Sequence, residues 1–320
     1  MRDDVPVMTF IPSKSFLKYF KGSYNRSGKC GYVLVKTVKE HAYVKDIYTF
    51  VKQSKLMESL PKHENVVALL GISEEEMPIY SYHEYVECLT LRNYMLRNYQ
   101  SSGLSASSSF TRNSRDSRGN NITIELYEFA EDVASGMCFL ISQNFKHPAL
   151  SLRKVLLSNS GQCKLYDIWP EEMSSDRIRH LLQRKDPPLA WMAPECIFLG
   201  QYHLNTDVWS YGVFMWELFS FGETPFKNMS TFEIEKEVRN SRNLPMPPNC
   251  PGAIFNLMLS SWNKDAEKRP HFDNILKQLS CLLQNLQHEN YNQREVDEIQ
   301  ERNSQQYHKY FTLESPSTDR

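Results

Sequence analysis

Long apolar runs and charge of one sign are scarce in this 320-residue sequence. No stretch approaches the roughly 18 consecutive apolar residues of a membrane-spanning helix. Twelve glycines and 16 prolines exclude collagen-like and proline-rich architectures. Lysine and arginine number 37 against 38 aspartates and glutamates, so the basic excess that nucleic-acid or anionic-membrane binding usually needs is missing. What remains is a globular chain, 41% apolar, long enough for one large domain or two modest lobes.

The cysteines lack the close spacing that metal sites and redox pairs need. Seven are present, an odd number, and no two lie within four residues of each other. We therefore expect buried, reduced thiols in a cytosolic protein. The N-terminus has no charged-then-apolar signal peptide, and whether a membrane span precedes Met1 stays open.

Short strands and one helix are predicted for the first part of the chain. Residues 5–38 are β-like and end in the β-branched run 31–38. Apolar residues recur at helical spacing over 45–60. Two further strand-like runs follow at 66–72 and 79–86. The pattern indicates a small lobe of strands with a single helix.

Beyond residue 91 the pattern becomes mostly helical. The serine-rich stretch 98–120 has almost no apolar content and is expected to be a flexible insert. Thr123 is expected to cap the helix that follows. Residues 207–219 predict a helix that is apolar almost all round and therefore lies in the core. After about residue 284 we expect the end of a last helix and then a loose polar tail.

Several short motifs carry a family resemblance. Residues 193–195 (APE), 207–212 (DVWSYG) and 268–270 (KRP) occur in the order found in protein kinases. Residues 191–195 (WMAPE) and 216–219 (WELF) narrow the resemblance to tyrosine kinases. The sequence resembles receptor tyrosine kinases of the platelet-derived, vascular endothelial and fibroblast growth factor receptor groups, which also carry an insert.

The resemblance covers roughly residues 5–283 and implies a two-lobed α+β fold. A small β-rich N-lobe with one helix, together with the hinge, would span 1–86. A larger, mainly helical C-lobe would span 87–283 and contain the insert 98–120, followed by a polar C-terminal tail at 284–320. In this family ATP lies under a glycine-rich loop and the peptide hydroxyl approaches a catalytic loop in the large lobe.

The catalytic-loop pattern HRDLAARN falls on residues 147–154 (HPALSLRK), where His147 and Arg153 match it. Ala149 stands at the place of the catalytic aspartate, and a methyl group cannot accept the proton of an attacking hydroxyl. Lys154 stands at the place of the Mg²⁺-holding asparagine, and an ammonium group offers no lone pair to a metal. Two placements of Lys154 stay open: beside the metal position, where it would repel the cation, or in solvent.

Two residues that contact ATP or Mg²⁺ in the family have counterparts here. Asp167 matches the aspartate of Asp-Phe-Gly and is the candidate metal ligand, although a plain capping or solvent-facing role is equally open. Ile168 and Trp169 replace the Phe and Gly, and we expect Trp169 to fix this segment in one conformation. Lys36 matches the lysine that reaches the phosphates. Its glutamate partner falls on Gln53, which cannot form the ion pair.

The nucleotide-binding surface also departs from the family. The glycines of the phosphate-binding loop fall among Pro12, Lys14 and Leu17. Larger side chains are expected around the adenine ring, at Tyr19, Leu34 and His83. The hinge residues Glu84 and Val86 remain candidates for contacting a nucleotide.

Residues that hold the kinase fold together match the family more closely. Asp207 is expected to bond the catalytic-loop backbone, and Glu195 to pair with Arg269. The column formed by Met57, Ile168 and His147 is expected to pack the two lobes together. No tyrosine lies between Asp167 and Glu195, so activation through a loop tyrosine is excluded.

The sequence therefore predicts a pseudokinase, a catalytically impaired tyrosine-kinase-like domain that acts as a signalling scaffold or allosteric partner. Protein partners are expected, among them an active kinase or receptor, and no nucleic acid. No cofactor would be required, and ATP and Mg²⁺ would bind weakly. The expected location is the cytoplasm, alone or as the cytoplasmic region of a membrane receptor. The alternative is a weak or unconventional ATP-dependent tyrosine kinase that uses Lys36 and Asp167.

Overall fold

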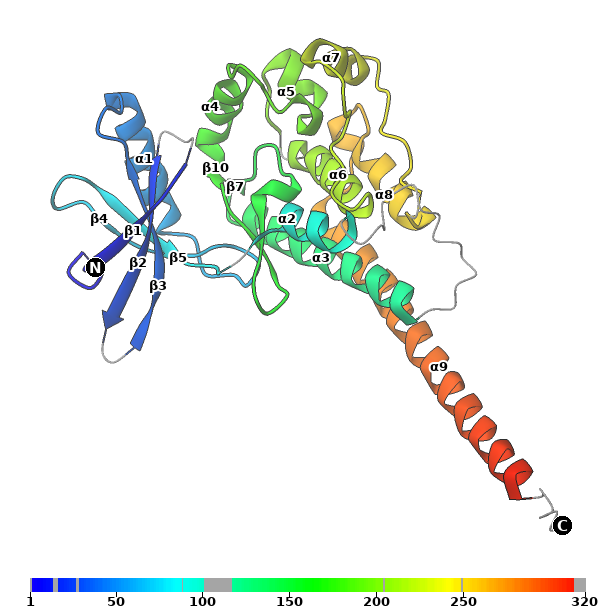
Figure 1. Cartoon of the computed structure of the whole chain (residues 1–320). Coiled ribbons are helices and arrows are strands. Elements are labelled where there is room, and N and C mark those ends of the chain that lie inside the picture. Colours follow the sequence, from blue (N-terminus) through cyan, green and yellow to red (C-terminus); the bar gives the residue numbers. More distant parts are fainter. Residues whose placement is uncertain are drawn as a thin grey trace.

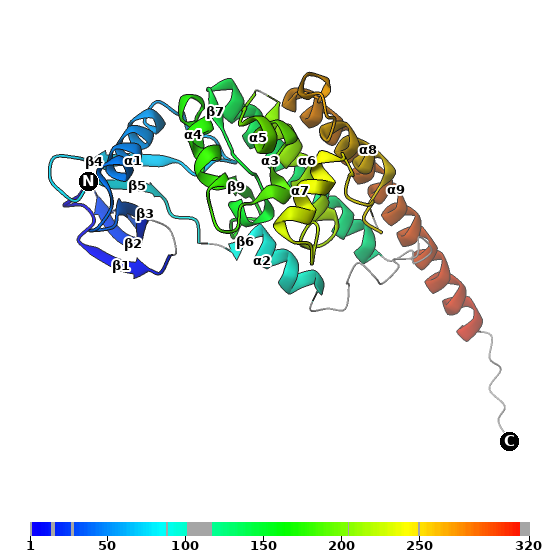
Figure 2. The same cartoon turned by 90° about the horizontal axis from the view of Figure 1, so that it is seen from above.

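A computed structural model describes residues 2–13, 17–26, 29–87, 89–100, 117–203, 205–248 and 250–313. A small lobe built on a sheet is followed along the chain by a larger helical lobe (Figure 1). The view from above shows the same division, with the largest sheet at one end and most helices at the other (Figure 2). The α+β, two-lobed architecture is as predicted.

Five antiparallel strands form the sheet of the small lobe, in the order β1-β2-β3-β5-β4. They are β1 Val7–Ile11, β2 Leu17–Arg26, β3 Lys29–Val38, β4 Leu69–Ser73 and β5 Tyr80–Glu84. Val33 and Val35 of β3 join a buried cluster with Tyr82. Because successive side chains of a strand point to opposite faces, Leu34 and Lys36 lie on the other face of the sheet.

Helix α1 (Val44–Met57) is the helix predicted for the small lobe. Its buried residues Phe50, Ser54 and Met57 recur at intervals of three and four, the spacing of one helix face. Met57 belongs to the same hydrophobic cluster as Ile168 and the large-lobe core. The two lobes are therefore in apolar contact at the end of α1.

Two small sheets carry the loops of the large lobe. Strands β6 (Leu89–Thr90), β8 (Val155–Leu157) and β9 (Cys163–Leu165) form one sheet in the order β6-β8-β9. Strand β7 (Phe145–Lys146) pairs with β10 (Trp169–Pro170) in the other. The segment after β7 contains the predicted catalytic loop, so this pairing brings it beside the segment that contains Asp167.

Helices make up most of the large lobe. They are α2 Leu91–Met95, α3 Ser117–Ser142, α4 Glu171–Leu182, α5 Pro194–Leu199, α6 Thr206–Phe219, α7 Thr231–Arg239, α8 Gly252–Ser261 and α9 Phe272–Leu313. Every residue of α6 is buried, as its all-round apolar pattern predicts. In the described ranges, no helix combines the length and apolar character that crossing a bilayer would require.

The prediction for the start of α3 is wrong. The helix begins at Ser117, so Thr123 lies within it and does not cap it. Part of the predicted insert is helical as well, because residues 98–100 belong to a π-helical turn, Leu96–Gln100, and 117–120 to α3. Residues 101–116 of the insert lie outside the described residues.

The predicted loose tail after residue 284 is also corrected, because α9 continues to Leu313. Its first turns place Phe272, Ile275, Leu279 and Leu283 in the core. Beyond them the helix runs away from the body of the lobe, as both views show (Figures 1 and 2).

Candidate functional site

Lys36 lies on a crowded face of the small-lobe sheet. Tyr19 of β2 is its cross-strand neighbour, and Leu34 faces His83 of β5 in the same way. Cross-strand neighbours share a face, so all three enlarged side chains lie on the face that carries the lysine. His83 is buried and hydrogen-bonded to Ser81 (Nε2 to Oγ, 3.1 Å). Burial, with a smaller effect from Lys36, holds the pKa of His83 well below its ordinary value, so the ring is neutral.

Among the described residues, no hydrogen bond joins Lys36 to Gln53. Burial lowers the pKa of Lys36 to about 8, against the opposing charge of Asp167. Gln53 of α1 donates its Nε2–H to the carbonyl oxygen of Ile168 at 2.9 Å. The residue at the family's glutamate position therefore ties α1 to the backbone next to Asp167.

Asp167 is surrounded by hydrogen-bond donors. Lys154 Nζ lies 3.0 Å from Oδ2, Arg177 Nη2 lies 3.3 and 3.2 Å from Oδ1 and Oδ2, and Trp169 Nε1 donates to Oδ1 at 3.0 Å. Burial alone would raise the pKa of Asp167, but Lys154 and Arg177 hold it well below its ordinary value, so the carboxylate is charged. Lys154 thus points to Asp167 and not to solvent. We call these four residues the Asp167 cluster.

Arg177 comes from α4, which sequence reasoning missed. Glu171 and Glu172 stand in its first turn, where acidic residues favour a helix start. Met173, Ile178 and Leu181 are buried on one side of the helix. These signals were available in the sequence. The Arg177 guanidinium also lies over the Trp169 ring, 4.8 Å from its centre, so the two side chains position each other.

Ala149, at the family's aspartate position, lies beneath α4. It is 6% exposed, has a φ of 55° and packs in a cluster with Ile178 and Leu181 of α4. The hollow that it lines with Ile178 and Tyr202 has a volume of about 10 Å³. That is the space of about one water molecule at most. A peptide side chain therefore has no room beside Ala149 while α4 is in place.

The residues around Asp167 do not fit a magnesium ion. Mg²⁺ requires an octahedron of oxygen ligands, whereas ammonium, guanidinium and indole N–H groups contact this carboxylate. Lys154 is further held by the Pro148 carbonyl oxygen at 2.6 Å. Elsewhere in the described part of the chain, no three or more His, Cys, Asp or Glu side chains converge as a metal site. Of the expected glycine-loop positions, Pro12 and Leu17 are described and Lys14 is not.

The expected polar contacts of the large lobe are present. The His147 N–H donates to Asp207 Oδ2 at 3.1 Å, and the His147 ring contacts the Tyr166 carbonyl oxygen at 2.7 Å. Arg269 pairs with Glu195 through two bonds of 2.6 and 2.8 Å. Burial, aided by the charge of Lys154, lowers the pKa of His147 to about 4, so its ring is neutral near pH 7.

Glu217 is a buried acid that sequence reasoning did not single out. Its Oε2 accepts bonds from Leu152 N and from Trp191 Nε1, both at 2.9 Å. Burial raises its pKa to about 7. Glu217 therefore supports the loop that contains Arg153. The Arg153 side chain is exposed, and its carbonyl oxygen accepts a bond from the Tyr166 hydroxyl.

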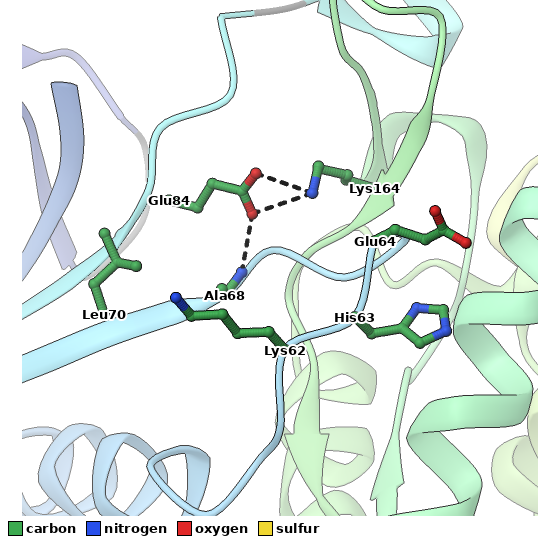
Figure 3. A pocket seen from close by; sticks show the side chains of 7 residues that line it. All are labelled: Lys62, His63, Glu64, Ala68, Leu70, Glu84 and Lys164. Carbon is green, nitrogen blue, oxygen red and sulfur yellow. Dashed lines mark hydrogen bonds and ion pairs between the residues drawn. The ribbon is translucent and has the colours of Figure 1, made fainter. Parts of the chain in front are cut away.

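The hinge carboxylate of Glu84 points away from the Lys36 face. Glu84 pairs across the strands with Val33, so it lies on the opposite face of the sheet. Its carboxylate meets Lys164 Nζ at 2.9 Å and accepts a bond from Ala68 N at 3.3 Å, in a hollow of about 370 Å³ (Figure 3). The Glu84 side chain therefore does not serve the nucleotide face. Val86 is half-buried in the hinge.

Comparison with known proteins identifies the family to which the chain belongs. The profile of the protein tyrosine and serine/threonine kinase family matches residues 8–279. The chain belongs to this family. It is 28% identical over 88% of its length to ephrin type-A receptor 5 of Gallus gallus. It is 30% identical over 78% to the tyrosine kinase receptor Cad96Ca and over 86% to the tyrosine-protein kinase transmembrane receptor Ror, both of Drosophila melanogaster.

The chain spans 26%, 32% and 38% of the lengths of these three relatives. All three are receptors by name, so the chain is a receptor-tyrosine-kinase-like domain. The motifs at 191–195 and 207–212 were therefore a sound guide to the family.

Proposed function

We propose that this kinase domain is catalytically inactive and acts by binding protein partners, as a scaffold or as an allosteric partner of an active kinase. The observation that carries the proposal is Ala149. At the position of the general base stands a methyl group, which is buried in one cluster with Ile178 and Leu181 of α4. The hollow beside the methyl group is too small for the acceptor hydroxyl of a peptide, and the acid that also lines it, Asp207, already accepts a bond from the His147 N–H.

Phosphoryl transfer depends almost entirely on positioning and charge neutralisation. The other substitutions in the site are therefore also expected to lower the rate of transfer. Loss of a general base typically costs about 10²- to 10⁴-fold in rate. Lys154 and Arg177 occupy the oxygens of Asp167, the carboxylate at the family's metal-binding position. Gln53 bonds Ile168 and leaves Lys36 without the family's ion pair. Catalytic groups act as a unit, so we expect their combined loss to leave no measurable transfer.

The test is transfer of radiolabelled phosphate from ATP to a tyrosine-peptide library by the 320-residue chain. The wild type and an Asp167→Ala variant are expected to give the same background. Incorporation by the wild type above that of the variant would overturn the proposal and favour the alternative, a weak kinase that uses Lys36 and Asp167. Thermal unfolding of both proteins verifies that each is folded.

ATP and Mg²⁺ are proposed to bind weakly, and none is required for the partner role. A ligand stabilises the native state in proportion to its occupancy, so millimolar Mg-ATP should leave the melting temperature nearly unchanged. A rise of several degrees would contradict weak binding.

The setting of the domain is part of the same proposal. We propose that residues 1–86 and 87–283 correspond to the N-lobe with its hinge and the C-lobe, and that the domain is the cytoplasmic region of a receptor of the split-kinase groups. The receptor names of its relatives support the setting. Adding the purified chain to an active receptor kinase should change that kinase's rate if the partner role is allosteric.

A further inference from the structure

Two cations from different parts of the chain meet at Asp167. Lys154 ends the 3-10 turn Leu152–Lys154 that follows the predicted catalytic loop. Arg177 comes from the middle of α4. Their side chains are 19% and 12% exposed, and that of Asp167 is 23% exposed. Solvent therefore screens these contacts less than it screens a surface ion pair.

We propose that Lys154 and Arg177 together replace the divalent cation at Asp167, and that Arg177 thereby fastens α4 over Ala149. The inference deepens the proposed function and rests on it for the absence of a catalytic metal. Arg177 carries one of the two positive charges at Asp167 and is itself part of α4. The contact that neutralises the carboxylate therefore also holds α4 in place.

The charges and contacts match what a divalent ion would otherwise supply. Lysine and arginine carry one formal charge each, so the pair equals the charge of Mg²⁺. Between them they contact both carboxylate oxygens at 3.0 to 3.3 Å. Each cation has a further contact, Lys154 with the Pro148 carbonyl oxygen and Arg177 with the Trp169 ring. These contacts within the chain hold Lys154 and Arg177 beside Asp167 without a bound ligand.

Other contacts of α4 are weaker candidates for the fastening. Glu172 pairs with Lys52 of α1 at 2.8 Å, but both side chains are well exposed, at 56% and 40%. Glu171 lies 3.7 Å from the buried Lys146, a distance beyond a hydrogen bond. Exposed ion pairs contribute little. The buried Ser174 bonds the Pro170 carbonyl oxygen just before the helix, and the Glu171 N–H donates to the Asn144 carbonyl oxygen at 2.9 Å. Arg177 is the α4 residue whose side chain hydrogen-bonds Asp167.

The first experiment asks whether a metal can bind once the two cations are removed. The full chain carrying Lys154→Asn and Arg177→Gln is titrated with MnCl₂, and its melting temperature is compared with that in EDTA. We expect a saturable rise in the double variant, no rise in the wild type, and loss of the rise when Asp167→Asn is added. A double variant that ignores the metal would overturn the proposal.

A measurement on the wild type keeps the proposal testable if the double variant does not fold. Electron paramagnetic resonance of Mn²⁺ titrated with the wild-type chain should show only free ion. Saturable Mn²⁺ binding that Asp167→Asn removes would show that the built-in cations do not replace the metal, and would overturn the proposal.

The second experiment tests the fastening of α4 by hydrogen exchange. Amides of α4 should exchange about tenfold faster in Arg177→Gln, because a local opening that loses one stabilising contact is populated more often. Arg179→Gln is the matched control. Arg179 lies two residues further along the same helix, is 68% exposed and pairs with the exposed Asp176. Equal exchange in the two variants would overturn the fastening.

These outcomes are distinguishable from failure of the proposed function. Neither experiment contains nucleotide or peptide, whereas the proposed function fails only if the wild type transfers phosphate. A chain that transfers no phosphate and yet binds Mn²⁺ at Asp167 would leave the inactive assignment intact and remove this inference.

Discussion

The acids in the core of the large lobe, Glu195 and Asp207, have different partners from Asp167, the acid at the family's metal-binding position. Glu195 pairs with Arg269, and Asp207 accepts a bond from the catalytic-loop backbone at His147, as in the pattern of the kinase family. Asp167 instead meets Lys154 and Arg177. The contacts that hold the fold match the family, while those that would hold a metal have been replaced by contacts within the chain.

The difference has a physical basis in burial. A buried acid without its partner is costly, so the core pairs are required whether or not a reaction takes place. A carboxylate beside the nucleotide face would ordinarily need a metal or water to offset its charge. In the Asp167 cluster, the side chains of Lys154 and Arg177 offset the charge, so Asp167 stays ionised without a bound ligand.

The largest expected effect comes from breaking the core pair. Arg269→Met leaves Glu195 buried without its cation and should lower the free energy of unfolding by about 3 to 5 kcal/mol, measured by urea denaturation. The control is Lys268→Met, which removes a neighbouring cation that is 72% exposed and should change stability by less than about 0.5 kcal/mol. Similar losses in the two variants would show that burial does not decide the effect.

A second prediction concerns the pH dependence that Glu217 gives to the core. Its folded pKa of about 7 lies above the ordinary 4.5, so the folded state keeps a proton that the unfolded state has lost. Its contribution to stability is therefore fully present below pH 4.5 and is lost as pH rises to 7. As pH rises from 4.5 to 7, the wild type should therefore lose on the order of 3 kcal/mol of stability relative to Glu217→Gln.

Urea denaturation at several pH values measures this change. Glu267→Gln, on an exposed residue, serves as the control. A constant difference between the wild type and Glu217→Gln from pH 4.5 to 7 would contradict the raised pKa.

The smallest expected effect comes from restoring the family's glutamate at position 53 of α1. Gln53→Glu removes the donor to the Ile168 carbonyl oxygen and should lower stability by about 0.5 to 1.5 kcal/mol. It should not produce phosphate transfer, because Ala149 and Lys154 are unchanged. Gln287→Glu on the exposed side of α9 is the control for stability. Phosphate transfer by Gln53→Glu would show that Gln53 alone had prevented catalysis in the wild type.

Local patterns account for what the sequence predicted correctly. The all-round apolar residues of α6 can only be buried, and the pairing of Glu195 with Arg269 follows from motifs that place both residues. Ala149 and Lys154 could be identified as substitutions for the same reason. The partner of Lys154 stayed undecided, because Asp167 is thirteen residues away and only the folded chain brings the two side chains together.

The parts that were missed depend on tertiary contacts or lack an apolar stripe. The helical character of α4 was legible in the spacing of Met173, Ile178 and Leu181, but its position over Ala149 was not. The later turns of α9 are polar, and a prediction based on apolar periodicity therefore ended that helix too early. Ser117 precedes the apolar stripe of α3, which is why its start was placed at Thr123.

Helix α9 is packed into the core at its N-terminal end and extends away from the large lobe at its C-terminal end. Leu283 is its last side chain in the core cluster of the described residues, and at 1.5 Å per residue Leu313 lies about 45 Å further along the axis. A tilt of about 10° at the anchored end would swing the far end through about 8 Å, since displacement grows with the length of a rigid rod. Small rearrangements where α9 meets α3 are thereby magnified into movements large enough for a pair of fluorescent labels to detect.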